Sequence, residues 1–191
     1  MGVRHCANLG NVHCSGKAMG VGGIGGRMGR DASGAGLFND WLNLRIEECV
    51  NRGEISCDNQ DTRVGGILGY QEEGHNCEIN NSLNAGAVTS KQKHDNGGLV
   101  GYMDHVSSCK NNVNSGKVSH GNATIGDHKG SYTADYNYYL DGSGKGWPSS
   151  SISIKESDFK KQSSFSHLDF DNYWTIGANG PEPKNCQWRN Y

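Results

Sequence analysis

No run of apolar residues in this 191-residue chain approaches the roughly 20 that are needed to span a bilayer. No hydrophobic signal-peptide segment precedes the first repeat. The formal net charge is only −2, which gives no basic surface for a nucleic acid or an anionic membrane. We therefore expect no membrane insertion and no nucleic-acid partner. Since only 34% of the residues are hydrophobic, a thick core is excluded too, and a thin core repeated along an axis is favoured.

A sequence motif with two halves recurs along the chain. The first half is an apolar residue, then Asn, any residue, Gly, any residue, and Val or Ile. It occurs four times, at residues 6–12 (CANLGNV), 49–55 (CVNRGEI), 82–88 (SLNAGAV) and 112–118 (NVNSGKV). The second half, Gly-Gly-Ile/Leu-x-Gly, occurs at 22–26, 65–69 and 97–101, and the fourth copy keeps only Ile125-Gly126. The chain is therefore a repeat protein whose fourth unit has lost part of the motif.

The spacing of the repeat favours strands. The repeated asparagines Asn8, Asn51, Asn84 and Asn114 lie 43, 33 and 30 residues apart, as expected of stacked repeats. The long first interval indicates an insertion at about residues 27–43. Apolar residues alternate and glycine is frequent, whereas a helix loses about 1 kcal/mol for each Gly. We predict an all-β fold: a β-solenoid or β-helix-like array of about four units over residues 1–130.

The repeated Gly and Asn residues fit such an array. Corners between short strands need a positive φ or a missing side chain, and glycine supplies both. Asparagine tolerates the left-handed region and bonds local backbone, and stacked copies can form a ladder of side-chain amides.

These motifs resemble the GLUG repeats of bacterial secreted and cell-surface proteins, including arrays beside immunoglobulin-A proteases and in adhesins. Residues 97–101 (GGLVG) are close to the motif that names the family, and the resemblance covers about Val3 to Ile125. The tail, with Tyr173-Trp174 before Gly180-Pro181, also looks like the segment that follows such arrays. The resemblance implies an extracellular repeat module with no reaction of its own.

Two pairs among the seven cysteines occupy equivalent positions of the repeat: Cys6 aligns with Cys49, and Cys14 aligns with Cys57. We expect these four to be buried thiols in neighbouring units, because a disulfide between stacked strands is close enough but poorly directed. His5, Cys6, His13 and Cys14 suggest zinc ligands, but adjacent strand residues point to opposite faces. We expect no metal.

Other motifs are weaker than the repeat. Residues 20–25 (GVGGIG) satisfy the dinucleotide-binding G-x-G-x-x-G pattern, but the same glycines recur in the other copies without a following helix. Residues 141–146 (DGSGKG) lack the first Gly and the Ser or Thr of a Walker loop and predict a turn. No catalytic spacing of Ser, Cys, His and Asp recurs. We expect no cofactor and no catalytic residue.

Residues 131–191 break the period and predict an aromatic C-terminal cap over the last unit. The capping-box pattern Ser153-Ile-Lys-Glu156 predicts one short helix ending near Lys161. The densest aromatic segment either begins this cap or contacts a ligand. Its residues are Tyr132, Tyr136, Tyr138, Tyr139 and Trp147.

The sequence predicts a non-enzymatic repeat module of a bacterial secreted or surface protein, acting as an adhesive surface or a spacer. A host protein or a glycan is the expected partner, and the oligomeric state stays open. A carbohydrate-binding module or a carbohydrate-active β-helix enzyme is the alternative, because of the aromatic segment. Such an enzyme would gather acids and bases on one face, and the acids do not align between repeats.

Overall fold

The computed structural model describes residues 2–29, 44–72, 77–91, 93–104 and 107–186. In these residues the fold is all-β, as predicted, and the helical segments are three short 3-10 turns. These are η1 (Glu156–Asp158), η2 (Gln162–Ser164) and η3 (Lys184–Cys186). None of the described helical segments is long and apolar enough to cross a membrane. Of the predicted insertion at 27–43, residues 30–43 lie outside the described part.

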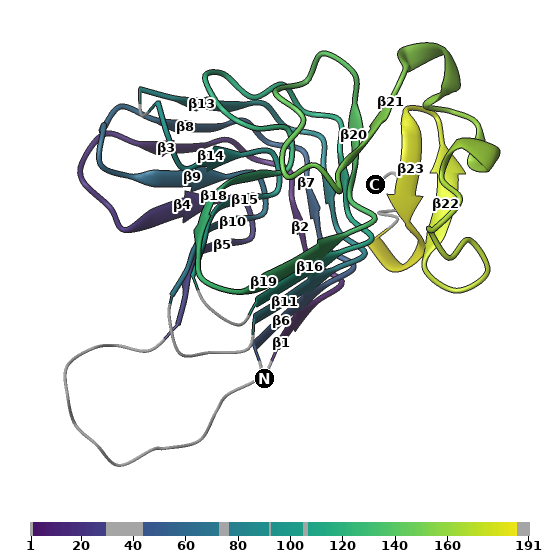
Figure 1. Ribbon diagram of the computed structural model, residues 1–191, viewed down its shortest axis with the longest axis horizontal. Helices are drawn as coiled ribbons and strands as arrows, with labels where there is room; N and C mark the ends of the chain where they lie inside the picture. Colours follow the sequence, from purple (N-terminus) through teal and green to yellow (C-terminus); the bar gives the residue numbers. More distant parts are fainter. Residues whose placement is uncertain (1, 30–43, 73–76, 92, 105–106, 187–191) are drawn as a thin grey trace.

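Two parallel sheets form one side of the molecule, and their strands pair in sequence order from the first repeat onward (Figure 1). Sheet A contains β1 (Gly2–Arg4), β6 (Leu44–Glu47), β11 (Cys77–Asn80), β16 (Ser107–Lys110) and β19 (Tyr132–Asp135). Sheet B contains β2 (Ala7–Asn8), β7 (Val50–Asn51), β12 (Leu83–Asn84), β17 (Val113–Asn114), β20 (Tyr138–Leu140) and β21 (Ile152–Ile154).

Three further parallel sheets complete each turn of the chain. Sheet C contains β3 (Val12–Cys14), β8 (Ile55–Cys57) and β13 (Val88–Ser90). Sheet D contains β4 (Gly20–Gly22), β9 (Arg63–Gly65) and β14 (Asn96–Gly97). Sheet E contains β5 (Gly25–Met28), β10 (Leu68–Gln71), β15 (Val100–Asp104) and β18 (Ile125–Lys129).

The chain thus passes through sheets A to E in the same order in each of the first three repeats, and the last part of the array contributes β19 to sheet A and both β20 and β21 to sheet B. We number the units 1 (residues 2–28), 2 (44–72), 3 (77–104), 4 (107–129) and 5 (132–154). Unit 4 has only single bridges, Val118 to Val88 and Asn122 to Gly97, where units 1 to 3 have strands of sheets C and D. The sequence predicted that the fourth unit departs from the repeat. The pairing continues beyond residue 130, where we had expected the array to end, because β19 and β20 pair in register with β16 and β17.

The repeated asparagines form the predicted ladder inside sheet B. Asn8, Asn51, Asn84 and Asn114 are in register on consecutive strands. Each Nδ2 donates to the Oδ1 of the next asparagine, at 2.8 Å in all three steps. The same Nδ2 also donates to the carbonyl oxygen two residues ahead in its own unit, for example Gly86 at 2.9 Å. The last three asparagines are fully buried, so the ladder satisfies amides that have no access to water.

The left-handed corners are not at these asparagines. One row of them lies three residues earlier, between sheets A and B, where five stacked non-glycine residues have φ between 50° and 56°. These are His5, Glu48, Asn81, Asn111 and Tyr136. The ladder asparagines lie in strands instead, because an extended backbone points their amides inward to the next unit.

The repeated glycines are needed for close approach, and positive φ is not the reason. The motif glycines are absent from the positive-φ glycines of the described chain, which are Gly29, Gly130, Gly142 and Gly180. A Cβ on Gly66 would collide with the Asn84 side chain and the Gly98 carbonyl, and one on Gly98 would meet Asn114 in the same way. Each Gly therefore leaves the space that the asparagine of the next unit occupies.

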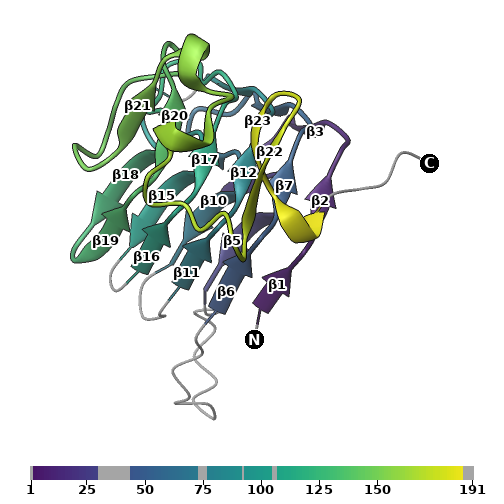
Figure 2. The ribbon, with the colours of Figure 1, turned by 90° about the vertical axis from the view of Figure 1, so that its right-hand side faces the viewer.

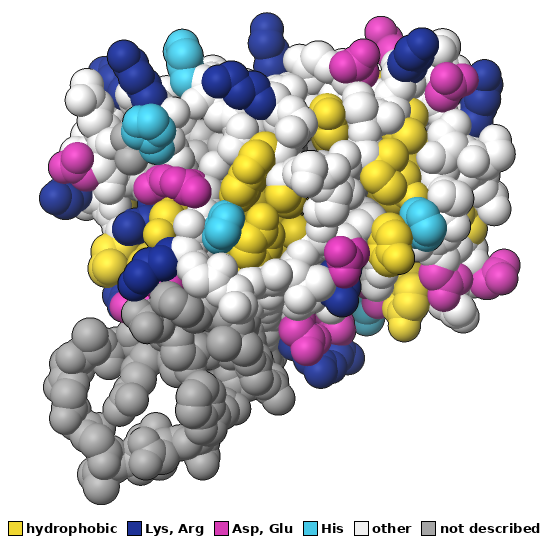
Figure 3. All heavy atoms as spheres, viewed as in Figure 1, with side chains coloured by type: hydrophobic (Ala, Val, Ile, Leu, Met, Phe, Trp, Pro, Cys, Tyr) yellow, Lys and Arg dark blue, Asp and Glu magenta, His cyan; other side chains and the backbone are white. Residues whose placement is uncertain are grey.

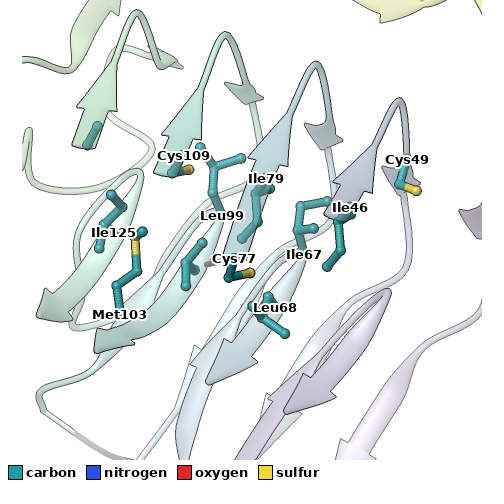
Figure 4. Packing of buried hydrophobic residues seen from close by; sticks show 12 residues of the cluster. Ile46, Cys49, Ile67, Leu68, Cys77, Ile79, Leu99, Met103, Cys109 and Ile125 are labelled. Atoms are coloured by element: carbon teal, nitrogen blue, oxygen red, sulfur yellow. The ribbon is translucent and has the colours of Figure 1, made fainter. Parts of the chain in front are cut away.

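The main core lies between sheets A and E (Figure 4). Sheet A contributes Ile46, Ile79 and Cys109, and sheet E contributes Leu68 and Met103, all at most 1% exposed. A second apolar cluster joins sheets C and D; it contains Val21, Ile55, Cys57, Val64, Val88 and Val118. The interior is thus the thin, repeated core that the composition predicts.

The cysteine prediction is half correct. Cys14 and Cys57 pair in register, and Cys49 and Cys57 are buried. Cys6 is exposed and Cys14 is half-buried, so the expectation of four buried thiols is wrong for unit 1. The reason is position: unit 1 is the first in the stack, and among the described residues its strands pair with unit 2 alone.

The predicted helix after Ser153 does not form. Ser153 lies in β21, and only the 3-10 turn η1 follows, with no side-chain cap. Backbone pairing explains the difference, because Ser153 is held beside Tyr139 of β20.

The C-terminal segment lies along the side of the stack, whereas we had expected it over the last unit. Residues 155–186 cross the outer face of sheet B toward unit 1, and we call them the strap (Figure 2). They include the hairpin of β22 (Trp174–Gly177) and β23 (Gly180–Pro183). Phe165 and Trp174 pack on the outward row of sheet B, which includes Leu83 and Val113. Because this row is apolar in every unit, the strap must cover its full length.

The ladder predicts a position-dependent loss of stability. Asn84→Ala removes a buried donor to Asn114 and Gly86 and an acceptor for Asn51, so we expect about 3 kcal/mol of destabilisation. Asn8→Ala, at the partly exposed end of the same ladder, should cost about 1 kcal/mol. Denaturant unfolding of both variants measures the difference, and equal losses would contradict a buried, coupled ladder.

Candidate functional site

A polar cavity of about 160 Å³ lies where sheet D meets sheet E, and residues of units 3, 4 and 5 line it. Figure 3 shows basic, acidic and histidine side chains gathered at the left of this face, over sheets C and D. The cavity lining is almost entirely polar or charged. It consists of Lys93, His94, Asp95, Asn96, His120, Gly121, Asn122, Gly126, Asp127 and Lys145.

Backbone pairing between units holds this lining in place. The backbone nitrogen of Asn122 donates to the backbone carbonyl of Asn96 at 2.9 Å, and the backbone nitrogen of Lys145 donates to the backbone carbonyl of Gly121 at 3.3 Å. The Asn122 side chain closes the loop with a 2.7 Å hydrogen bond to the Gly126 carbonyl. Three units therefore fix the walls before any ligand arrives.

Asp95 and His120 occupy the same left-handed corner in units 3 and 4, with φ of 55° and 57°. Both lie two residues before the paired positions Gly97 and Asn122. Since the two backbones follow the same path, their side chains stand next to each other at the cavity.

Asp95 is an acid of the cavity whose surroundings shift its pKa. Burial raises the pKa of Asp95, the Arg63 guanidinium opposes the rise, and the charge of Asp127 adds to it. Arg63 Nε lies 3.8 Å from Asp95 Oδ2. Two carboxylates with different surroundings thus face the same space, the half-buried Asp95 and the exposed Asp127.

An outward row on sheet E adjoins the cavity. Arg27, Tyr70, Tyr102 and Asp127 are in register on β5, β10, β15 and β18. The two tyrosine rings meet edge to face at 5.9 Å. Arg63 lies over both, with Cζ 4.3 Å and 4.8 Å from the ring centroids. Arg63 therefore connects the tyrosines to Asp95.

Both tyrosines keep their protons at neutral pH. Burial raises the pKa of Tyr70 and of Tyr102, the carboxylate of Asp104 adds to the rise for both, and the guanidinium of Arg63 opposes it. Each phenol therefore stays a hydroxyl that both donates and accepts hydrogen bonds.

The five aromatic residues singled out from the sequence do not form one surface. Tyr132 and Trp147 both contact His128 at the end of the array: the His128 ring stacks on Trp147 with a centroid distance of 5.3 Å and is tilted against Tyr132 at 4.1 Å. They pack against the core between sheets A and E. They therefore close the end of that core, the position at which we had expected the C-terminal cap.

The other three lie in or beside sheet B. Tyr138 is 1% exposed and meets Phe165 of the strap edge to face at 5.2 Å. Tyr136 is 45% exposed, and its ring stacks on His167 at 4.0 Å. Tyr139 is half-buried in β20. Tyr136 is thus the one of the five with a large exposed surface.

Sequence reasoning missed the cavity because it looked for acids at equivalent positions of the repeat. Asp95 comes from a corner before sheet D, and Asp127 comes from a strand of sheet E. Their only signal is proximity to the motif: Asp95 lies two residues before Gly97, and Asp127 directly follows Ile125-Gly126.

His5 and His13, considered above as metal ligands, each bond a neighbour in unit 2: His5 Nε2 lies 3.1 Å from Glu48 Oε1, and His13 Nδ1 lies 3.0 Å from Ser56 Oγ. In the described part of the chain, no three His, Cys, Asp or Glu side chains form a group suited to a metal ion.

Comparison of the chain with family models, with curated proteins and with solved structures gives no match. The cavity must therefore be interpreted from its own chemistry.

The raised pKa of Asp95 predicts a pH-dependent effect on stability. Below its ordinary value near 3.8, Asp95 is protonated in both states. As the pH rises above that value the unfolded chain ionises first, so stability is lost until the folded pKa is passed. Asp95→Asn removes this loss. The melting temperature of the variant relative to wild type should therefore rise from about pH 3 to about pH 7.

Asp169→Asn is the matched control, because hydrogen bonds from Asn172 lower the pKa of Asp169. Its melting temperature relative to wild type should fall over the same interval. The same trend for both variants would contradict the assigned direction for Asp95.

Proposed function

We propose that the chain is a β-solenoid binding module of a bacterial secreted or surface protein, and that its ligand is a glycan. The observation that carries the proposal is the cavity, in which Asp95, Asp127, His120 and Lys145 come together from three units. The half-buried Tyr102 lies in register with Asp127 on the neighbouring strand of sheet E, beside the cavity.

The mixture of donors and acceptors favours a glycan. Sugar hydroxyls both donate and accept, so they suit a cavity in which carboxylates accept while lysine and histidine side chains donate. A polyanion would meet the carboxylates of Asp95 and Asp127. The volume of about 160 Å³ suits one small unit of a chain better than a protein surface.

The repeat supports the solenoid and surface-protein part of the proposal. All five repeated sheets are parallel, and the asparagine ladder keeps successive units in register. The parallel sheets, the ladder and the GLUG-like motif together favour a rigid extracellular module that presents one site at a fixed corner of the stack.

The proposal predicts that the carboxylate of Asp127 is needed for binding. On a glycan array, and then by calorimetry with the best glycan, Asp127→Asn should weaken binding by about tenfold or more, because a hydrogen bond to a charged group is lost. Asp61→Asn is the control, since Asp61 is exposed, bonds Lys17 and lies outside the cavity. Unchanged binding by Asp127→Asn, or binding of a host protein and no glycan, would refute the glycan site.

A second candidate function is glycan cleavage, and the observation that favours it is a second carboxyl, Asp127, that lines the same cavity as Asp95, whose pKa burial raises. Two carboxyl groups, one of them with a raised pKa, are the groups by which an acid and a base act on a glycosidic bond. In this role Asp95 would give the proton and Asp127 would act as the base or nucleophile.

Cleavage is tested separately from binding. Purified protein is incubated with the polysaccharides it binds, and new reducing ends and unsaturated products are measured. Activity that is lost in both Asp95→Asn and Asp127→Asn, but kept in Asp61→Asn, supports an enzyme. Binding without any product leaves the non-enzymatic module.

A further inference from the structure

A second site lies at the opposite end of the stack, where the strap reaches unit 1. Three cysteines from distant parts of the chain meet there: Cys6 between β1 and β2, Cys49 between β6 and β7, and Cys186 in η3. We propose that Cys6 and Cys186 are a disulfide-forming pair that locks the strap onto the first unit.

The contacts place the strap sulfur beside unit 1. Cys186 Sγ lies 3.6 Å from the Cys6 carbonyl oxygen and donates to the Glu48 carbonyl. The neighbouring Asn185 side chain donates to the Glu48 carboxylate. These bonds hold the end of the strap against the first two units, beside the backbone of Cys6. The Cys6 thiol donates to the Arg4 carbonyl at 3.3 Å, so it must turn away from that bond to meet Cys186.

Cys49 is the competing partner, and its geometry is less favourable. Cys6 and Cys49 lie on adjacent parallel segments, since the Val50 nitrogen donates to the Cys6 carbonyl at 2.8 Å. Side chains that leave adjacent strands in the same direction are far from the Cβ–S–S–Cβ dihedral near 90° that a disulfide requires. The two thiols are close to each other, and each donates to the carbonyl two residues earlier in its own unit, Cys6 to Arg4 and Cys49 to Glu47, both at 3.3 Å, so both side chains point in the same direction.

Access to solvent sets the order of reaction. Cys6 is exposed, whereas Cys186 is 8% exposed. Burial raises the pKa of Cys186 to about 12 and the pKa of Cys49 to about 11. Cys6 is therefore the thiol that meets an external oxidant first.

The oxidant is a small-molecule disulfide such as oxidised glutathione. The Cys6 thiolate attacks one sulfur and releases one equivalent of the small thiol, which leaves a mixed disulfide on Cys6. The Cys186 thiolate, formed by loss of its proton to water, then attacks Cys6 Sγ and releases the second equivalent. Two protein thiols are oxidised, and one small-molecule disulfide is reduced to two thiols.

The test oxidises the full chain with oxidised glutathione and maps its peptides without reduction. We expect Cys6 joined to Cys186, with a melting temperature about 10 °C higher that returns to the original value on reduction, because the bond closes a very long loop. Cys6→Ser and Cys186→Ser should each remove the link and the shift. Cys14→Ser, at the other incompletely buried cysteine of unit 1, should keep both.

Three outcomes would overturn the proposal. These are a link between Cys6 and Cys49, a stable mixed disulfide on Cys6 alone, or a Cys6–Cys186 link that forms only after the protein is unfolded. Cys49→Ser separates the first of these from the expected result, because it should leave the Cys6–Cys186 link intact.

Discussion

The side-chain amide of asparagine is the group on which the stack depends. It is the one side chain of its size that can accept from the unit before, donate to the unit after and still donate to its own backbone. Asn51 and Asn84 make all three bonds while fully buried. A unit that slipped by one residue would leave buried amides unpaired, so the ladder fixes the register that the thin apolar core alone would leave loose.

The same constraint determines what lies on both sides of sheet B. Its middle strands β7, β12 and β17 are two residues long, and successive residues of a strand point to opposite faces. Because the asparagine points inward, the preceding Val50, Leu83 or Val113 points outward. The inward amide needs the gap left by a glycine of the preceding unit. The outward apolar row needs a cover, which the strap supplies. Ladder, glycine motif and strap are therefore parts of one packing solution.

The periodic part of this solution could be predicted from the sequence, and the aperiodic part could not. The asparagines repeat, so their pairing follows from counting. The left-handed corners do not repeat in residue type, since His5, Glu48 and Tyr136 share one conformation that the stacked backbone imposes. The strap has no period at all, and the capping-box pattern just before it was outweighed by pairing of Ser153 with β20. Asp95 and Asp127 meet only because a corner and a strand of different units are adjacent in space.

The strap also ties the two ends of the array to each other. It leaves the stack after β21 of unit 5 and is fastened at η3 beside unit 1. Each unit adds about 4.8 Å to the height of the stack and one apolar residue to the outward row of sheet B. A duplicated unit would preserve the ladder and the core, but it would leave an added apolar residue that no present strap residue covers. The strap therefore couples the number of units to the length of the segment that covers them.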